Sequence, residues 1–346
     1  MFRAPWLKLG LVGATGVVGA TVLRVLEERH VPVSELRAYA SRDRDATVRF
    51  DGADIPVYGA SVERLRHDQN DVLIFASSDD ASAEMAQAAV DAGSLVIDNS
   101  STFRLDPGCP LVIPEVNSDA VQPQHRIFPV GNCTAIILCV ALAPIAKSAG
   151  LRSVRVATYQ AVSGAGRAGL ETLDAEERGG RPNGTFAAPI FRNVVPQIGS
   201  FDAFGDSGEE KKVVLETRKV LGLPNLHVAA TTVRVPVRRA HSEAVFFETE
   251  RPTTREDLAR AFDLAGGIVY HADGIVTPLD VEDRDDVHVA RLRPEADSLR
   301  EEGMPQTRFQ MWVVGDQLRK GAATNGVQII ELLLEKGMLR ARSSAK

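Results

Sequence analysis

The motif GATGVVG at residues 13–19 constrains the fold of this chain more than any other feature of the sequence. The apolar stretch 7–12 before it predicts a strand, and residues 17–29 after it carry apolar side chains at helical spacing. In a strand-turn-helix unit, such glycines let the backbone approach a pyrophosphate, while the helix N-terminus supplies amide donors and a partial positive charge. The alternative is a tight turn that binds no ligand. The motif therefore predicts the start of a nucleotide-binding βαβ unit.

Strands and helices alternate in the first part of the chain and then change pattern. Apolar stretches predict strands at 35–40, 71–76 and 94–98, with a helix at 81–92. This alternation is typical of α/β proteins with a doubly wound, Rossmann-type sheet. After Gly131 we expect a second, α+β domain, with a helix at 134–149, strands at 153–161, 227–237 and 244–250, and a final helix at 327–336. The length of 346 residues also favours two domains, because single cores stop growing at about 250 to 300 residues.

Charge and cysteine content narrow the class of partner. The formal net charge is -6, with 40 Lys and Arg against 46 Asp and Glu, and it lacks the basic excess that neutralises nucleic-acid phosphates. Three cysteines are odd in number and too few for a disulfide framework, which indicates a reducing, cytoplasmic compartment. No apolar run in the sequence approaches the roughly 18 residues of a membrane-spanning helix. We therefore expect a small-molecule ligand, and neither a nucleic acid nor a membrane.

Cys133 is the candidate nucleophile. The sequence Gly131-Asn132-Cys133-Thr134 comes directly before a predicted helix, where the macrodipole and free amides lower the pKa of a thiol. The Asn132 amide and the N–H of Cys133 itself are suited to hold an oxyanion. The alternative is a small buried apolar residue, which describes Cys139 and Cys109 better than Cys133.

A nucleophilic thiol needs a base, and His241 is the best candidate among seven histidines. It follows a strand-like run that polar residues interrupt, although sequence spacing alone does not place it near Cys133. A hydrogen-bonded structural ring is the alternative. We find no HExxH, CxxC or carboxylate-rich loop, and so we predict no catalytic metal.

The end of the second predicted strand bears on the choice of cofactor. An NAD site places an acid there to hold the ribose hydroxyls, whereas this strand ends in Ser41 and Arg42. A hydroxyl and a guanidinium suit a 2′-phosphate, which favours NADP. Asp43 and Asp45 follow closely and oppose that interpretation.

Ten motifs in a shared order resemble those of the aspartate-β-semialdehyde dehydrogenases, almost from end to end. They are GATGVVG (13–19), DNSSTFR (98–104), PEVN (114–117), GNCTAI (131–136), QAVSGAG (160–166), PQIGSF (196–201), ETRKVL (216–221), VRVPV (233–237), HSEAV (241–245) and KGAATNGVQI (320–329). The resemblance implies an enzyme that reduces β-aspartyl phosphate to aspartate β-semialdehyde with NADPH and releases phosphate, on the route to lysine, threonine and methionine.

The resemblance also implies roles for individual residues. Cys133 would attack the acyl phosphate, and His241 would act as acid and base at the hemithioacetal oxygen. The substrate-binding residues would be Arg104 and Lys212 for the phosphate, Arg234 for the α-carboxylate, Glu209 for the ammonium group, Gln160 for orientation and Asn132 for the oxyanion. The cofactor-binding residues would be Gly13, Thr15, Gly16, Val17, Val18, Ser41, Arg42, Ser77, Ser163, Gly164 and Asn325.

Domain organisation and assembly follow from the same resemblance. It implies an NADP-binding domain of residues 1–132 with 320–346, and a catalytic and dimerisation domain of residues 133–319. A homodimer would form through the second domain, with the Gly-, Pro- and Phe-rich segment 179–208 as the first place to look for the contact. Two stretches at the cofactor depart from the family pattern. They are 76–80, where Asp79 would have to point away from the pyrophosphate, and 42–47.

Three other functions compete with this one. An N-acetyl-γ-glutamyl-phosphate reductase would use the same thiol and imidazole, but its substrate has no free ammonium group to pair with Glu209. A cofactor-binding paralogue without catalysis is opposed by the presence of Cys133, His241, Arg104 and Arg234. A cysteine hydrolase is disfavoured by the glycine-rich turn.

Overall fold

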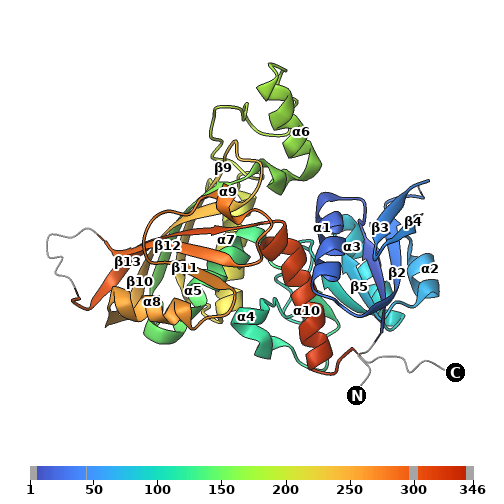
Figure 1. Ribbon diagram of the computed structural model, residues 1–346, viewed down its shortest axis with the longest axis horizontal. Helices are drawn as coiled ribbons and strands as arrows, with labels where there is room; N and C mark the ends of the chain where they lie inside the picture. Colours follow the sequence, from blue (N-terminus) through green and yellow to red (C-terminus); the bar gives the residue numbers. More distant parts are fainter. Residues whose placement is uncertain (1–5, 44, 296–302, 340–346) are drawn as a thin grey trace. The chain divides into compact units, whose positions relative to one another are not determined.

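A computed structural model describes residues 6–43, 45–295 and 303–339 of the chain (Figure 1). The chain forms two compact units: unit 1 comprises Met1–Gly131 with Ala322–Lys346, and unit 2 comprises Asn132–Gly321. The ends of the predicted first domain, residues 1–5 and 340–346, lie outside the described residues. The last helix of the chain thus belongs to the same unit as the glycine-rich turn.

Unit 1 contains a seven-stranded sheet in the order β3-β4-β2-β1-β5-β6-β7. Its strands are β1 (Leu7–Val12), β2 (Val33–Ala40), β3 (Thr47–Phe50), β4 (Ala53–Gly59), β5 (Val72–Phe75), β6 (Leu95–Asp98) and β7 (Ile127–Pro129). All pairs are parallel except β3 with β4. Strand β5 is apolar and buried along its whole length, as expected of a parallel strand that is covered on both faces. The predicted doubly wound sheet is confirmed.

The helices of unit 1 cover this sheet. They are α1 (Val17–Glu28), α2 (Val62–Asp68), α3 (Asp79–Asp91), the short α4 (Pro114–Asn117) with a 3-10 turn at Ser118–Ala120, and α10 (Thr324–Glu335). In α1 the residues Val22, Val25 and Leu26 are buried, and each stabilises the fold by roughly 1.5–3 kcal/mol. Helix α10 lies beside α1 (Figure 1), where Arg29 and Glu331 form an ion pair at 2.7 Å.

Close packing explains the glycines of the turn between β1 and α1. Gly13 has a φ of 86°, and a Cβ at this position would lie 2.2 Å from the carbonyl oxygen of Ala76. A Cβ on Gly19 would lie 2.2 Å from the carbonyl oxygen of Gly13. The backbone therefore passes closer to its neighbours here than any side chain permits.

Sequence analysis did not predict β3, β4 or α2. Strands β3 and β4 form a hairpin at the edge of the sheet, and most of their residues are exposed. Pro56 lies in β4 one residue before Val57, where the pairing with β2 begins, so its missing N–H removes no hydrogen bond to β2. These strands lack an apolar run because only one face of the hairpin contacts the protein, and their sequence is hard to distinguish from a loop.

Unit 2 contains a mixed six-stranded sheet in the order β11-β12-β13-β10-β8-β9. Its strands are β8 (Ser153–Gln160), β9 (His227–Arg234), β10 (His241–Thr253), β11 (Ile268–His271), β12 (Val287–Pro294) and β13 (Gln306–Gly315). Its helices are α5 (Cys133–Ala149), α6 (Gly166–Glu177), α7 (Gly208–Leu221), α8 (Arg255–Asp263) and the short α9 (Pro278–Val281), with a 3-10 turn at Val162–Ala165 and a π-helical turn at Arg319–Ala323. This is the expected α+β arrangement.

Helix α5 is the central helix of unit 2. It contacts α7, α8 and the strands β10 and β13. Eleven of its residues are buried, because the sequence from Ala135 to Leu142 is apolar around the whole circumference of the helix. The sequence predicted a start at Thr134, and the structure begins the helix one residue earlier, at Cys133.

The segment between α6 and α7 forms neither helix nor strand, apart from isolated bridges at Val195 and Phe201. It is anchored by a buried carboxylate, since Glu176 accepts hydrogen bonds from the amides of Ile190 and Phe191 at 2.7 and 2.8 Å. Apolar residues of the segment pack against Leu173 of α6. The absence of periodic features in the sequence is matched by this irregular but anchored segment.

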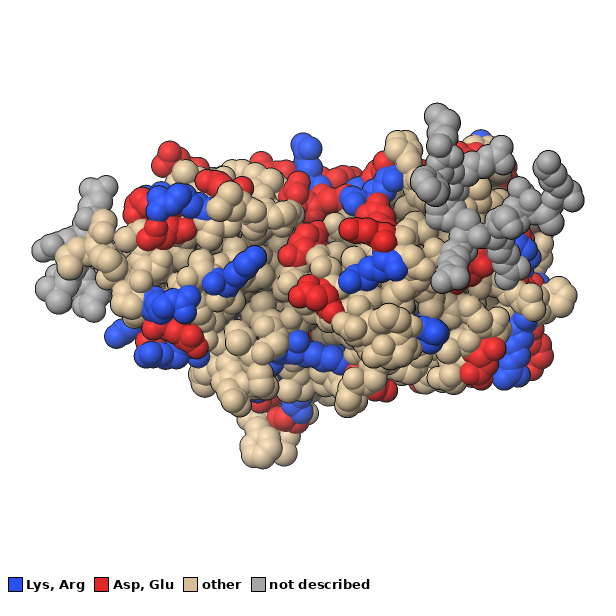
Figure 2. Space-filling model, turned by 90° about the horizontal axis from the view of Figure 1, so that it is seen from below, with Lys and Arg blue, Asp and Glu red and all other residues tan. Residues whose placement is uncertain are grey.

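Figure 2 shows acidic and basic side chains interspersed over one face of the molecule. Surface ion pairs such as Arg155 with Glu295, 3.1 Å apart, contribute at most about 1 kcal/mol each. Across residues 6–43, 45–295 and 303–339, we find no helix that combines the length and apolar character of a membrane span.

Candidate active site

Cys133 is the first residue of α5, at a helix N-terminus that favours an anion. Its side chain is half-buried, and its sulfur is not part of a disulfide. Gly321 leaves room beside it, because a Cβ on Gly321 would lie 2.8 Å from the Cβ of Cys133. A thiol held here is accessible and close to backbone amide donors, which are the requirements for a nucleophilic cysteine.

Asn132 fixes the start of α5 as its N-cap residue. Its Oδ1 accepts hydrogen bonds from the amides of Thr134 and Ala135, both at 3.1 Å. Such a cap stabilises a helix by about 1 kcal/mol. The Nδ2 of Asn132 donates to Glu209 at 2.9 Å, and its backbone N–H donates to Glu216 at 2.5 Å. The side chain predicted to hold an oxyanion therefore also orients the helix start.

Glu209 connects several of the predicted substrate-binding residues. It lies in the first turn of α7, which a capping box at Ser207 and Glu210 holds in place. Its buried Oε1 accepts hydrogen bonds from Asn132 and from Nε2 of Gln160, the latter at 3.0 Å. Lys212, one turn along the helix, has its Nζ 3.9 Å from Oε2 of Glu209. The carboxylate thus holds two amides and faces one ammonium group.

Arg234 lies beside Gln160, because β8 and β9 pair these two residues at their ends. Its guanidinium is buried and donates to the carbonyl oxygen of Ala161 at 2.6 Å. Burial lowers the pKa of Arg234, while the negative charges of Glu209 and Cys133 act in the opposite direction. The structure therefore gathers Cys133, Gln160, Glu209 and Arg234 in one region of unit 2.

His241, the first residue of β10, belongs to the same cluster. Its Nδ1 accepts a hydrogen bond from the amide of Ala161 at 3.1 Å, so the neutral ring carries its proton on Nε2. That Nε2 is buried without a hydrogen-bond partner among the described residues. Burial and the charge of Arg234 lower the pKa of His241 to about 3, although the Ala240 backbone acts in the opposite direction. A neutral imidazole with an uncommitted N–H is suited to donate a proton or hydrogen bond to a developing oxyanion.

The turn at Val162–Ala165 packs against both Arg234 and His241. A Cβ on Gly164 would lie 2.6 Å from Nη1 of Arg234 and 3.3 Å from Nε2 of His241. Any side chain at position 164 would displace one of these groups. Ser163 and Gly164, predicted to contact the cofactor, therefore adjoin the predicted catalytic base within unit 2.

Arg104 is in unit 1, in the segment that follows β6. Its buried guanidinium donates from Nε to the carbonyl oxygen of Val130 at 2.9 Å and from Nη2 to that of Asn99 at 2.8 Å. Val130 comes three residues before Cys133 in the sequence. The predicted phosphate-binding arginine is thus held by backbone carbonyls of its own unit.

A hollow of about 560 Å³ in unit 1 is lined by the glycine-rich turn. Five of the predicted cofactor-binding residues line it, namely Gly13, Thr15, Gly16, Ser41 and Ser77. Helix α1 begins next to it at Val17 and Val18, with no acidic residue in its first turn. The buried hydroxyl of Ser77 has no partner among the described residues. A narrow approach at glycines, an uncapped helix start and an unpaired hydroxyl fit a pyrophosphate.

Two of the acids in the stretches that depart from the family pattern are bound by other groups of the protein. Asp79 accepts hydrogen bonds from the amide and hydroxyl of Ser101 at 2.8 and 2.7 Å. Asp43 accepts from the amide of Gly59 at 2.7 Å and lies 3.7 Å from Arg64. Arg42, directly before Asp43, is exposed.

Asn325 lies outside the set of residues that line this hollow. It is buried in α10, where its Nδ2 donates to the carbonyl oxygen of Val112 at 2.9 Å. This contact joins α10 to the segment before α4 within unit 1.

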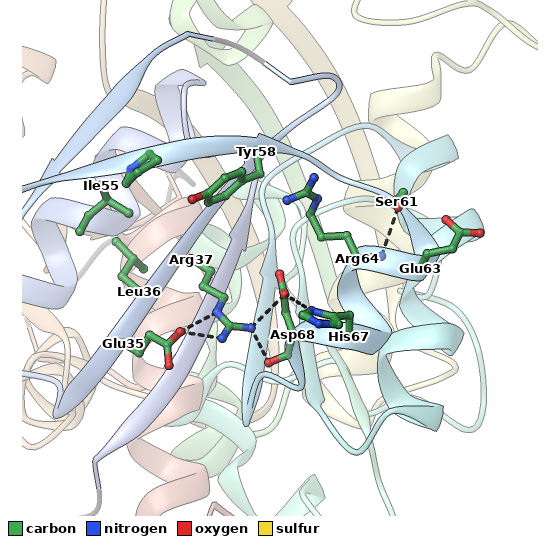
Figure 3. A pocket seen from close by; sticks show the side chains of 11 residues that line it. Glu35, Leu36, Arg37, Ile55, Tyr58, Ser61, Glu63, Arg64, His67 and Asp68 are labelled. Carbon is green, nitrogen blue, oxygen red and sulfur yellow. Dashed lines mark hydrogen bonds and ion pairs between the residues drawn. The ribbon is translucent and has the colours of Figure 1, made fainter.

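A second hollow in unit 1, of about 800 Å³, lies between β2, β4 and α2 (Figure 3). Its charged groups bind one another: Arg37 lies 2.6 Å from Glu35 and 3.2 Å from Asp68, and His67 lies 3.0 Å from Asp68. None of the residues that sequence analysis singled out is among the described residues that line it. Within the described residues, no three His, Cys, Asp or Glu side chains converge as metal ligands.

Three residues of the site have contacts that sequence analysis did not identify. Glu216 binds the amide of Asn132, Gln317 binds the amide of Ala240, and Gly321 packs against Cys133. Glu216 and Gly321 lie within two of the recognised motifs, but sequence analysis gave neither residue a role of its own. Gln317 lies outside all ten motifs, so no sequence signal pointed to it.

Comparison with known proteins gives matches over nearly the whole chain. Residues 8–124 match the family described as "Semialdehyde dehydrogenase, NAD binding domain", and residues 142–320 match "Semialdehyde dehydrogenase, dimerisation domain". The aspartate-semialdehyde dehydrogenase of Aquifex aeolicus is 39% identical over 345 residues, covering 96% of this chain and 99% of that protein. Aspartate-semialdehyde dehydrogenase 2 of Vibrio cholerae is 40% identical over 337 residues, covering 94% and 97%.

Solved structures give the same result. The crystal structure of aspartate semialdehyde dehydrogenase II from Vibrio cholerae, complexed with ASA, superposes with a TM-score of 0.88 at 38% identity. The match covers 95% of this chain and 98% of that one.

Proposed function

The chain belongs to the aspartate-semialdehyde dehydrogenase family, and we propose that it reduces L-aspartyl-4-phosphate to L-aspartate 4-semialdehyde and releases phosphate. The observation that carries the proposal is the cluster in unit 2. A half-buried cysteine begins α5, and a buried arginine, a buried glutamate and a neutral histidine lie around the same strand ends. This set supplies a nucleophile, an acid and groups for both charges of an amino acid.

The Cys133 thiolate attacks the carbonyl carbon of the acyl phosphate. The S–C bond forms, the bond from carbon to the phosphate oxygen breaks, and phosphate leaves with its electron pair, which gives a thioester. Bound NADPH supplies the hydride that reduces this thioester. His241 donates a hydrogen bond from Nε2 to the oxygen of the resulting hemithioacetal and shares its proton with that oxygen until the C–S bond breaks, the Cys133 thiolate leaves with the electron pair and the aldehyde is released.

Binding and stabilisation are assigned to the charged and amide groups of the site. Arg234 binds the α-carboxylate in a bidentate fork, and Glu209 binds the ammonium group. Lys212, next to Glu209, binds the phosphate together with Arg104. Gln160 orients the substrate, and Asn132 holds the oxyanion together with the backbone amides at the start of α5. Both side chains donate hydrogen bonds to Glu209, which supports their place in the same site.

We assign NADP as the preferred nicotinamide cofactor, with unit 1 as the cofactor-binding unit. Ser41 lines the hollow at the glycine-rich turn, Arg42 is exposed directly after it, and the opposing Asp43 is bound by Gly59 and Arg64. Loss of a charge-assisted hydrogen bond costs about 1.5–3 kcal/mol. We therefore expect Arg42→Ala to raise KM for NADPH by about 10-fold or more and to leave KM for NADH unchanged. Arg49→Ala, an exposed arginine of the same unit, is the control, and an equal effect on both cofactors contradicts the assignment.

The substrate is tested in the reverse direction, with phosphate, NADP and one of two semialdehydes. We expect reduction of NADP with aspartate semialdehyde, because the buried Glu209 and Arg234 are complementary in charge to a free ammonium group and a free carboxylate. Activity only with N-acetyl-glutamate semialdehyde would identify the enzyme as the acetylated-glutamate reductase instead. Inactivity with both, in protein that still binds NADPH, would identify a paralogue without catalysis. Replacing NADP by NAD in the same assay measures the cofactor preference.

We propose that the protein is a cytoplasmic homodimer that assembles through unit 2, and the matched dimerisation-domain family supports this. Gly315 pairs with His241, and both lie on the side of the sheet that faces Ile137 of α5. Ala244 comes three residues after His241 along β10, so its side chain points to the opposite side of the sheet. There Ala244 lies between Trp312 and Ala157, beside the partly exposed ring of Tyr159.

This apolar sheet face is the expected contact, and the segment 179–208 is the second place to test. Ala244→Arg should halve the mass measured by light scattering, whereas Ala83→Arg on the exposed side of α3 should leave it unchanged. A dimer that persists with Ala244→Arg and is lost when 179–208 is shortened would move the contact to that segment.

A further inference from the structure

The residue directly before His241 has an unusual backbone conformation. Ala240 has a φ of 67°, in the left-handed region, although it carries a side chain. It is also fully buried. This conformation is unfavourable for residues other than glycine, and it persists where the surrounding structure imposes it. Because Ala240 immediately precedes β10, its conformation sets the direction in which His241 enters the strand.

Two tertiary contacts hold Ala240 in place. Its methyl group packs in a buried apolar cluster with Val276, Val281 and Val314. Its backbone N–H donates to Oε1 of Gln317 at 2.7 Å, across 77 residues of sequence. Gln317 is itself 2% exposed and comes two residues after the end of β13. Without this acceptor the N–H of Ala240 would be buried and unpaired, which favours rearrangement of the turn.

The other end of the Gln317 side chain binds the second segment that flanks the His241 ring. Its Nε2 donates to the hydroxyl of Ser163 at 2.5 Å. Ser163 precedes Gly164, whose backbone lies against Nε2 of His241 and Nη1 of Arg234. One buried amide therefore ties together the residue before the imidazole and the turn that packs on the imidazole.

We propose that Gln317 is a positioning residue that acts through Ala240 and Ser163 to fix the ring of His241 for proton transfer. This inference rests on the proposed role of His241 as the acid. Fixing the ring matters because the proton must pass between atoms at hydrogen-bond distance, and misplacement by about 1 Å costs up to about 100-fold in rate. The left-handed Ala240 is the element under strain, and Gln317 is the group that keeps it there.

The first test is Gln317→Met, which keeps the length of the side chain and removes both hydrogen bonds. We expect kcat in the reverse assay to fall by about 10- to 100-fold, with KM for aspartate semialdehyde and for NADP within about 3-fold of the original values. Gln310→Met is the matched control, since Gln310 on β13 is half-buried and binds Arg293. It should leave kcat within about 2-fold. An unchanged kcat in Gln317→Met would overturn the proposal.

The second test is rescue by glycine, which a purely structural role for Gln317 does not predict. Glycine adopts the left-handed conformation without strain, so Ala240→Gly should recover at least about 5-fold of the kcat lost in Gln317→Met. Absence of any recovery would overturn the proposal. If Gln317→Met does not fold, Gln317→Asn replaces it, since the shorter side chain draws the amide back by one methylene. Recovery of kcat by Ala240→Gly is then measured in the Gln317→Asn background.

The third test separates this inference from the proposed function. In a His241→Gln background, Gln317→Met should cause no further loss of kcat, because a residue that acts only through His241 has nothing left to position. An additional loss of full size would show that Gln317 acts on another group and would overturn the inference alone. Full turnover of His241→Gln itself would instead overturn the proposed role of His241.

Discussion

Cys133 and His241 are the first residues of α5 and β10, whereas Cys139 and Glu243 lie further along the same two elements. We call Cys133 and His241 the terminal pair, and Cys139 and Glu243 the inner pair. Each pair combines a cysteine of α5 with an ionisable residue of β10. The inner pair is fully buried, and Cys139 is close enough to Glu243 for the carboxyl to influence its thiol. The two pairs therefore differ in position along their elements rather than in the kind of residue.

Burial keeps the inner pair uncharged. It raises the pKa of Cys139, and the carboxyls of Glu243 and Glu216 raise it further. It also raises the pKa of Glu243 well above its usual value, and both carboxyl oxygens lack hydrogen-bond partners among the described residues. The terminal pair instead adjoins amide donors and the guanidinium of Arg234. The comparison teaches that the start of a helix or strand, beside amide donors and a guanidinium, makes reactive a residue type that stays inert further along the same element.

The largest expected difference is between the two cysteines. Cys133→Ala should lower turnover by at least about 10⁴-fold, because no covalent intermediate can form, while NADPH binding measured by fluorescence stays nearly intact. Cys139→Ala is the matched control on the same helix. It should keep turnover within about 3-fold and lower stability by roughly 1 kcal/mol, through loss of a buried sulfur atom. Comparable activity losses in the two variants would remove the distinction between the pairs.

The next effect in size concerns the stability of the terminal pair in acid. The pKa of His241 is lowered to about 3, whereas an unfolded histidine titrates near pH 6.5. Below pH 6.5 the unfolded chain therefore takes up a proton that the folded protein does not. The free energy of unfolding falls by about 1.4 kcal/mol per pH unit, or roughly 4 kcal/mol in all, as the pH approaches 3.

His241→Gln removes this proton uptake, and urea unfolding between pH 6.5 and 3.5 is the measurement. The variant should lose stability in acid less steeply than the original protein, because the other titrating groups are common to both. Parallel curves would mean that the ring is charged in the folded protein and that burial does not keep it neutral.

Asn132→Ala is expected to have an intermediate effect, because Asn132 both caps α5 and is proposed to hold the oxyanion. Loss of the cap should cost about 1 kcal/mol of stability, and loss of the oxyanion donor should lower kcat by about 10²- to 10³-fold. Thr254→Ala is the control for capping alone, because it removes the hydrogen bond that the Thr254 side chain accepts from the amide of Asp257 at the start of α8. If Asn132→Ala lowers kcat no more than Thr254→Ala does for the same loss of stability, the role of Asn132 is purely structural.

The sequence predicted the elements with strong apolar patterns and the residues that begin them. Strand β1 and helix α1 were predicted closely because their apolar residues follow the spacing of the element, and α5 because its apolar run is too long for a strand. Strands β11, β12 and β13 were not predicted, because polar and apolar residues mix where charged loops adjoin them. Cys133 was identified by its place before a helix, which is a local property of the sequence.

The long-range contacts that support the site could not be predicted from the sequence, for a different reason. Glu216 reaches Asn132 across 84 residues, and Gln317 reaches Ala240 across 77. Such pairs depend on how α7 packs on α5 and on where β13 ends beside β10, and periodicity does not encode either. The left-handed conformation of Ala240 was equally hidden, since glycine and asparagine are the residues that signal it in a sequence.

The smallest effect is expected from the inner pair, and its sign is definite. Because burial raises the pKa of Glu243, the folded protein keeps this carboxyl protonated while the unfolded chain releases the proton above about pH 4.5. The contribution of Glu243 to stability is therefore present in acid and lost as the pH rises. Glu243→Gln, an uncharged isostere, should gain stability over the original protein between pH 5 and 8, as measured by the shift of Tm, with turnover within about 2-fold. A gain that appears at every pH would point to packing instead of ionisation, and a large loss of turnover would place Glu243 with the terminal pair.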